Sequence, residues 1–293
     1  MKYKRAICYS GYREGQSPLT KIYPSYDEIK EDLCILSSNY DILRLYDPSL
    51  HANLVLNCIK KEKFDFKVIL GMDLLSEYNN KECPWKNQNL SEDELNNHIK
   101  ENDDSLNELV KLTNEFSDIV MAVSAGNEAR PFWGDNLVPE SRIVYFINEL
   151  KSKTNKPTTY CEGFDVWQGR IPLILDAVDF VSVHIYPQWN KVPLKDAFNY
   201  TVSNFMETKK YVKKDTIITE CGWSTLSNHK SMHSFEASVD SQKEYIKSLD
   251  EYAKKNDELF VFFEAFDEPW KGGDNPAEPE KNWGLYSVKR ELK

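Results

Sequence analysis

Two glutamates stand at the ends of short apolar, β-branched segments of this sequence. Glu128 follows the run 118–126 and Asn127, and Glu220 ends the run 216–220. Two carboxyl groups that converge can do acid–base and nucleophilic chemistry on a sugar: one protonates the leaving oxygen and the other attacks carbon. A strand-end glutamate can instead cap a helix or pair with a cation. Two apolar runs that each close on a glutamate are less easily explained in that way.

Eight apolar, β-branched runs recur along the 293 residues, and turn residues bound each of them. They cover residues 6–10, 41–46, 66–71, 118–126, 158–161, 179–186, 216–220 and 259–266. Helical patterns separate most of the runs. Three helix starts are marked by Ser25 with Glu28, by Ser91 with Glu94, and by Pro139.

This strand–helix alternation predicts a parallel sheet, and eight units in one chain of this length predict a (β/α)8 TIM barrel. A doubly wound sheet is the rival fold, but it would need a glycine-rich turn after the first run, which residues 10–15 do not provide. We see no linker and no repeat, so we expect a single catalytic domain over residues 1–293.

Such a barrel carries its chemistry at the carboxyl ends of its strands. Asn127 lies beside Glu128 and is a candidate to hold a sugar 2-hydroxyl. Arg44 and Lys271 are candidate cations for an ionised glutamate. The alternatives are a salt bridge inside the barrel mouth for Arg44 and an exposed loop position for Lys271.

Aromatic side chains near the strand ends are candidate platforms for sugar rings. They are Tyr46, Tyr186, Trp189 and Trp223, with Trp85 as a candidate for a more distant subsite. Core or loop packing is the alternative reading for these side chains.

The composition restricts the partner. The net charge is −10, which disfavours nucleic acid and anionic membranes and leaves a neutral or cationic partner. No apolar run reaches transmembrane length, and the basic N-terminus lacks the apolar stretch of a signal peptide. The six cysteines are scattered without a close pair, so we expect neither a zinc nor a redox site.

The strand-end residues resemble glycoside hydrolase family 17, the 1,3-β-glucanases and 1,3-β-glucanosyltransferases, over nearly the whole chain. The most specific segments are 126–128, 219–223, 263–271 and 280–285, and the last two are more similar to the bacterial and fungal branch than to the plant enzymes. The resemblance implies that Glu128 is the general acid/base and Glu220 the nucleophile. It also implies that Tyr46 borders the cleft and that a charged group supports the nucleophile, formed by Glu268, Lys271 and Glu280.

The sequence departs from the family at two places. Ser224 and Thr225 stand where Pro-Ser often follows the Gly-Trp pair, and Pro269 stands where the plant enzymes have Asn. Both changes affect loop shape and subsites more than the two glutamates.

These observations predict a retaining, endo-acting 1,3-β-glucanase that forms a covalent glucosyl-enzyme, with its two carboxyl groups about 5 to 5.5 Å apart. We expect a neutral β-glucan as the partner, no metal, no organic cofactor and a monomer. A glucanosyltransferase or an exo-acting glucanase would use the same two glutamates, whereas a non-catalytic glucan-binding barrel would have lost one. A polymeric substrate favours an extracellular or periplasmic location with the signal already removed, although the sequence leaves a cytoplasmic location open.

Overall fold

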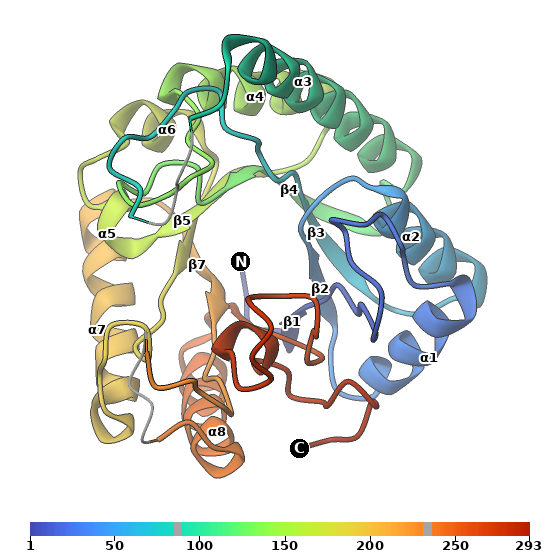
Figure 1. Ribbon diagram of the computed structural model, residues 1–293, viewed down its shortest axis with the longest axis vertical. Helices are drawn as coiled ribbons and strands as arrows, with labels where there is room; N and C mark the ends of the chain where they lie inside the picture. Colours follow the sequence, from blue (N-terminus) through green and yellow to red (C-terminus); the bar gives the residue numbers. More distant parts are fainter. Residues whose placement is uncertain (85–88, 231–235) are drawn as a thin grey trace.

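Eight parallel strands close into a barrel in chain order, so each strand pairs with the next and the last pairs with the first. The structure, a computed structural model, describes residues 1–84, 89–230 and 236–293. Figure 1 shows the strands at the centre and the helices around them. The strands are β1 (Ala6–Cys8), β2 (Ile42–Leu45), β3 (Lys67–Gly71), β4 (Val120–Asn127), β5 (Thr158–Gly163), β6 (Val181–His184), β7 (Thr216–Cys221) and β8 (Phe260–Phe262).

Helices cover the outside of the barrel between successive strands (Figure 1). In the described chain they are α1 (Tyr26–Ser37), α2 (Leu50–Glu62), α3 (Glu92–Glu115), α4 (Glu140–Lys153), α5 (Phe164–Trp167), α6 (Pro172–Ala177), α7 (Leu194–Val212) and α8 (Val239–Asn256). The segment after β8 contains only the 3-10 helix η1 (Pro279–Lys281). The predicted (β/α)8 barrel is confirmed, with a strand in each predicted run. No helix of the described residues is both long and apolar enough to cross a membrane.

The predicted capping boxes form at the starts of α1 and α3. The Ser25 hydroxyl accepts a hydrogen bond from the Glu28 amide, and the Glu28 carboxylate accepts one from the Ser25 amide. Ser91 and Glu94 form the same reciprocal pair. Pro139 precedes the first residue of α4, as predicted. These caps satisfy amide groups that a helix start leaves unpaired, so they fix where the helices begin.

Alternation along each strand sorts side chains between the barrel interior and the layer under the helices. On β2, Leu43 and Leu45 pack outward against the helices, whereas Ile42 packs inside the barrel. The same parity places Arg44 inside, where it is buried, and Tyr46 at the interior edge. Inward-facing polar side chains of several strands therefore meet at the carboxyl end of the barrel.

An irregularity near the end of β4 sets the direction of its last residues. Ser124 pairs with Thr159 and Asn127 pairs with Cys161, so β4 contains one more residue than β5 between these pairs. The extra residue breaks strict alternation, as a β-bulge does. Gly126, within this stretch, has φ +149°, a conformation that favours glycine.

β7 contains a similar irregularity. Val183 pairs with Ile218 and His184 pairs with Glu220, so Thr219 is the extra residue of β7. If β7 alternated regularly through Thr219, Glu220 would face the same side as Ile218, which packs outward in the core. The bulge therefore directs Glu220 into the barrel mouth.

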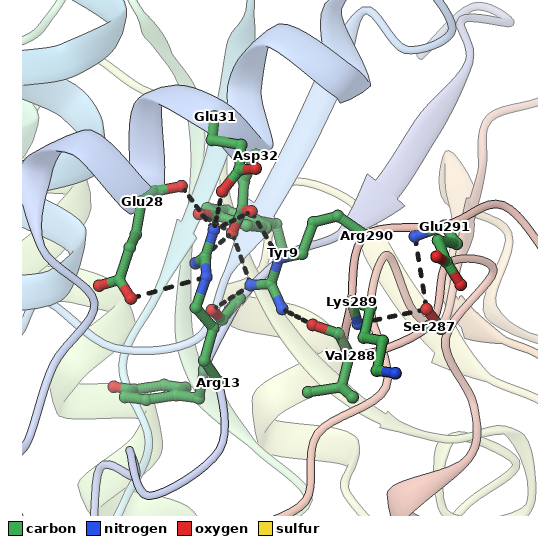
Figure 2. Close-up of polar contacts among 12 residues, drawn as sticks. Tyr9, Arg13, Glu28, Glu31, Asp32, Ser287, Val288, Lys289, Arg290 and Glu291 are labelled. Carbon is green, nitrogen blue, oxygen red and sulfur yellow. Dashed lines mark hydrogen bonds and ion pairs between the residues drawn. The ribbon is translucent and has the colours of Figure 1, made fainter.

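A buried ion-pair cluster joins the two ends of the chain. Figure 2 shows Asp32 of α1 between Arg13, from the β1–α1 loop, and Arg290, near the C-terminus. Asp32 is fully buried, accepts hydrogen bonds from both guanidinium groups at 2.8 to 3.4 Å, and also accepts one from the Tyr9 hydroxyl. Arg290 donates a further bond to the Gly11 carbonyl. We call Asp32, Arg13 and Arg290 the Asp32 cluster.

Candidate active site

A cavity of about 250 Å³ opens at the carboxyl ends of the strands. Its lining brings together five residues predicted from the sequence: Tyr46, Asn127, Glu220, Lys271 and Glu280. A larger cavity of about 450 Å³ lies between α8 and the C-terminal segment, but it contains none of the predicted site residues. The chemistry predicted from the sequence therefore belongs to the smaller cavity.

Three side chains donate hydrogen bonds to the Glu220 carboxylate. Arg44 Nη1 and the Tyr46 hydroxyl both reach Oε1, the latter at 2.9 Å, and the Tyr186 hydroxyl reaches Oε2 at 2.6 Å. The second guanidinium nitrogen of Arg44 donates to Asn127 Oδ1 at 2.6 Å. One arginine thus orients both Glu220 and Asn127, and it leaves the Asn127 amide nitrogen as the donor for a ligand.

These contacts keep Glu220 ionised. Burial alone would raise the pKa of Glu220, but the positive charges of His184 and Arg44 and the hydrogen bonds from Tyr186 and Arg44 outweigh burial and lower it to about 2. A carboxylate that is negatively charged and partly stripped of water has the state that a nucleophile needs.

His184 joins the two predicted glutamates. Its Nδ1 lies 2.7 Å from Glu128 Oε1 and 3.5 Å from Glu220 Oε2. One oxygen of each glutamate and one nitrogen of His184 all lie within 4.8 Å of one another. The Glu128 side chain is 31% exposed and that of Glu220 only 8%, so Glu128 is the more accessible of the two.

The charge of His184 follows from its neighbours. Burial opposes the charged imidazole, but the Glu220 carboxylate, a hydrogen bond with Cys161 and the Glu128 carboxylate raise the pKa of His184 to about 10. A positive charge between two carboxylates reduces their mutual repulsion and allows them to approach closely.

Lys271 has other partners than the one expected. Its Nζ lies 2.6 Å from Glu264 Oε2 and 2.8 Å from Glu268 Oε2, so its ion pairs are with these two buried glutamates and not with Glu220. The Glu268 carboxylate also accepts a hydrogen bond from the Tyr12 amide at 3.1 Å. The ion pairs of Lys271 and the hydrogen bond from Tyr12 therefore fix the loop after β8 against the loop after β1.

Glu280 shares the cavity with Glu220 and Lys271. Burial, with a further contribution from the negative charges of Glu220 and Glu128, raises the pKa of Glu280 to about 7, although Lys271 acts in the opposite direction. Near neutral pH this carboxyl group can hold a proton and donate a hydrogen bond to a ligand hydroxyl.

Tyr46 lines the cavity, and Tyr186 shares the Glu220 carboxylate with it. Tyr46 and Tyr186 are half-buried and pack edge-to-face on Phe263, with ring centroids 6.5 and 5.9 Å away. Trp189 is also half-buried and packs against Trp283 at 6.1 Å. All three residues are partly exposed to solvent, as a sugar platform requires.

Trp223 has a different place. It is fully buried, its indole nitrogen donates to the Glu236 carbonyl, and its ring packs on Tyr245 at 5.6 Å in the core under the helices. The structure does not bring Trp223 to the cavity, because core packing occupies its side chain. Trp85 lies outside the described residues.

Sequence reasoning did not assign a site role to His184, Glu162 or Glu264. His184 ends β6 two residues before Tyr186, at the same inward parity, which is a signal that the strand pattern contains. Glu162 ends the apolar part of β5 in the way that Glu220 ends that of β7, but the predicted run stopped at Cys161. Glu264 lies inside the last predicted run, where its neighbours are apolar.

Glu128, His184 and Glu220 also form the one group of three metal-ligand side chains found in the described chain. Two features disfavour a cation there. Arg44 already places a positive charge on Glu220, and the raised pKa of His184 means that its ring must lose a proton before it can bind a metal. The arrangement is better suited to proton transfer and nucleophilic attack.

Residues 6–284 match the family model of the BtgE/BtgC glycoside hydrolase domain. The chain belongs to this family of glycoside hydrolases. A curated relative from Aspergillus niger, named putative glucan endo-1,3-beta-glucosidase btgC, is 27% identical over 305 residues. That alignment covers 95% of this chain and 41% of the relative, so the chain spans about two fifths of the relative's length.

Solved structures agree with the family. An endo-laminarinase from Formosa has a TM-score of 0.81 and 26% identity, with 97% of this chain and 83% of the other covered. An active-site mutant of Rhizomucor miehei beta-1,3-glucanosyltransferase in complex with laminaritriose has a TM-score of 0.74 and 20% identity, with 99% and 95% covered, and shares the fold. The resemblance to glycoside hydrolase family 17 drawn from the sequence is confirmed.

Proposed function

We propose that this chain is a retaining, endo-acting 1,3-β-glucanase with Glu220 as nucleophile and Glu128 as general acid/base. The facing pair carries the proposal: an oxygen of each glutamate lies within 4.8 Å of the other. Retaining enzymes hold their carboxyl groups about 5 to 5.5 Å apart, whereas inverting enzymes need about 6.5 to 9.5 Å to admit a water molecule. The short separation and the ionised state of Glu220 support direct attack by Glu220.

The reaction has two steps. In the first, Glu220 attacks the anomeric carbon, Glu128 gives its proton to the glycosidic oxygen, and the leaving sugar departs from a covalent glucosyl-enzyme. In the second, the Glu128 carboxylate takes a proton from water, the water oxygen attacks the same carbon and Glu220 is released. Each step inverts the anomeric carbon, so the product keeps the β-configuration.

The neighbouring side chains have supporting roles in this proposal. Arg44, Tyr46 and Tyr186 stabilise the charge of Glu220 before attack and after release. Asn127 presents its amide nitrogen to the sugar 2-hydroxyl, a contact that strengthens in the transition state. Tyr46, Tyr186 and Trp189 offer ring faces to the glucan, and Glu280 with Lys271 lines the cavity that receives it.

The relatives support the choice of substrate, because they are named a glucan endo-1,3-beta-glucosidase and an endo-laminarinase. We further propose that residues 1–293 form one catalytic domain, that this domain works as a monomer, and that it acts outside the cytoplasm, since a glucan polymer is too large to reach an enzyme inside an intact cell.

The test is incubation with linear 1,3-β-glucan, 1,4-β-glucan and mixed-linkage glucan, with the products sized over time. Internal cleavage of 1,3-β-glucan gives a spread of intermediate lengths early in the reaction. Release of only one short product contradicts endo action, and products longer than the substrate at high oligosaccharide concentration assign the chain to glucanosyl transfer.

Stereochemistry tests the two roles separately. Proton NMR taken before mutarotation should show the β-anomer first. Glu220→Gly should lose turnover and, with azide and an activated glycoside, form an α-glycosyl azide, whereas Glu128→Gly should form a β-glycosyl azide. Exchange of the two azide products contradicts the assignment of the roles.

A further inference from the structure

Glu128 occupies an unusual backbone conformation. Its φ is +43°, in the left-handed region that residues other than glycine seldom adopt. Such a conformation persists only where surrounding contacts enforce it. The contacts that hold this turn therefore determine where the Glu128 carboxyl group lies.

Strand β5 supplies those contacts. Three successive amide groups, those of Glu128, Ala129 and Arg130, donate to the Cys161 carbonyl at 2.9 Å, the Tyr160 hydroxyl at 2.8 Å and Glu162 Oε2 at 3.1 Å. All three acceptors belong to consecutive residues of one strand. The turn that bears Glu128 is thus bound to β5 over its whole length.

Tyr160 and Glu162 act as one unit in this arrangement. The Tyr160 hydroxyl accepts from Ala129 and donates to Glu162 Oε2 at 2.8 Å, and Glu162 Oε1 accepts from the Gly163 amide at 2.8 Å. Both side chains are almost fully buried. A buried carboxyl group that accepts hydrogen bonds at both oxygens has little freedom to move, and so it can fix its partners.

We infer that Tyr160 and Glu162 are positioning residues for the general acid/base, holding the strained Glu128 turn so that the carboxyl group meets the glycosidic oxygen. This inference rests on the proposed function of Glu128. We expect neither residue to touch the substrate, because both act through the turn that bears Glu128. Burial, with a further contribution from the negative charge of Glu128, raises the pKa of Glu162 to about 8. His184 Nδ1 contacts the Glu128 carboxylate at 2.7 Å.

The test compares kcat/KM for two substrates that differ in their need for an acid. A laminarioligosaccharide has a poor leaving group and needs a proton from Glu128, whereas a 2,4-dinitrophenyl β-laminaribioside does not. Glu162→Ala should lower kcat/KM by about 100-fold on the oligosaccharide, as expected for a misplaced catalytic group, and by less than about 5-fold on the activated glycoside.

Conservative variants separate positioning from general damage. Glu162→Gln keeps an acceptor for Tyr160 and Arg130, so it should recover most of the oligosaccharide activity. Tyr160→Phe leaves the Ala129 amide without its acceptor. It should also lower kcat/KM mainly on the oligosaccharide, but by about 10-fold, a tenth of the loss expected for Glu162→Ala. Tyr160→Phe removes a single oxygen atom, so it keeps the inference testable if Glu162→Ala does not fold.

Two reference variants make the outcomes distinct. Glu77→Ala removes another buried, ion-paired glutamate away from the cavity, and should not favour one substrate over the other. Glu128→Gln should show the full substrate-dependent loss; if it does not, the proposed function fails. Suppose that Glu128→Gln shows that loss. If Glu162→Ala and Tyr160→Phe then lower kcat/KM equally for both substrates, or for neither, the positioning inference is wrong.

Discussion

Positive charge is the condition that allows two carboxylates to face each other in this site. His184 contacts both glutamates, and Arg44 holds Glu220 from the barrel interior. His184 lies between the two carboxylates, whereas Arg44 pairs with Glu220, so Glu220 has two cations beside it and stays ionised. The roles that we propose for Glu128 and Glu220 agree with this distribution of positive charge.

This arrangement predicts how His184→Asn changes the acidic limb of the pH profile of kcat/KM. The charge of His184 is the largest favourable contribution that lowers the pKa of Glu220 to about 2. Without the charge of His184 the pKa of Glu220 rises, so Glu220 takes up a proton at higher pH. The acidic limb of the profile should therefore move to higher pH. Steady-state kinetics on 1,3-β-glucan measure this shift. Circular dichroism at each pH controls for unfolding. An acidic limb that stays in place contradicts the role given to His184.

His51 leads to a prediction about stability. It is buried, stacks on Tyr12 at 5.3 Å, and faces Asp47 and Glu268. Burial lowers the pKa of His51 from 6.5 to about 4, although these two carboxylates partly oppose the shift. Between pH 6.5 and 4 the unfolded chain therefore binds a proton that the folded chain does not.

His51 should thus contribute stability that is complete above about pH 6.5 and is lost as the pH falls toward 4, by an amount on the order of 3 kcal/mol. His51→Phe keeps a ring on Tyr12 and should reduce the dependence of the free energy of unfolding on pH. Urea unfolding of both proteins at each pH gives the difference. The exposed His229 is the matched control. Equal slopes for the wild type and His51→Phe count against the buried neutral state.

At this scale the sequence predicted the two glutamates because each closes an apolar run. Glu162 does the same on β5, but its run was closed one residue early, so it was missed. The sequence grouped Lys271 with Glu268, one of its two partners, but it did not identify Glu264, because spacing along the chain does not show which carboxylates a lysine contacts. Trp223 follows Glu220 closely, yet the bulge in β7 and the turn after it direct its ring into the core.

At the scale of single elements, the irregular ends of β4 and β7 matter more than the regular strands. Gly126 has φ +149°, and a Cβ added there would come within 2.7 Å of Leu74 Cδ1 and 3.0 Å of the Tyr160 ring. Gly126→Ala should therefore destabilise the fold by about 1–3 kcal/mol through strain and should also reduce activity, because Tyr160 and the Glu128 turn must move. Thermal unfolding and glucanase assays measure the two effects.

The matched control for Gly126→Ala is Gly273→Ala, since a Cβ at Gly273 meets no atom within 4 Å and its φ is not restricted to glycine. Gly273→Ala should leave both measurements close to those of the wild type. If Gly126→Ala does the same, the geometry of the β4 bulge is not a constraint on the site.

Helix starts were predictable where side chains mark them. The capping boxes of α1 and α3 and the proline of α4 gave three starts. α2 begins after Ser49, which makes no side-chain cap hydrogen bond, and α7 begins after Pro193, also without one. The bulges were not predictable, because they depend on the register between neighbouring strands and a single strand's pattern does not contain it.

For the whole molecule, the Asp32 cluster ties α1 and the β1–α1 loop to the C-terminal segment that follows β8 (Figure 2). Arg290→Ala should destabilise the protein by about 3 kcal/mol, because it leaves the fully buried Asp32 with less compensating charge. Urea unfolding measures the change.

The double variant Asp32→Asn with Arg290→Ala should be more stable than Arg290→Ala alone, since it removes the uncompensated charge. Lys111→Ala, which removes an exposed ion pair with Glu108, should leave the unfolding midpoint unchanged. Equal loss in the single and double variants means that the cluster acts through packing and not through charge.

The net charge of −10 gives a last prediction that concerns the whole molecule and its substrate. A neutral glucan releases no counterions when it binds, and salt screens only interactions between charges. The KM for 1,3-β-glucan should therefore change by no more than about two- to threefold between low and moderate ionic strength. Carboxymethylated 1,3-β-glucan is the matched comparison: repulsion from the acidic protein should give it a KM that falls as salt is added. A steep salt dependence with the unmodified glucan would mean that ionic contacts contribute to binding, and it would contradict recognition of a neutral polysaccharide.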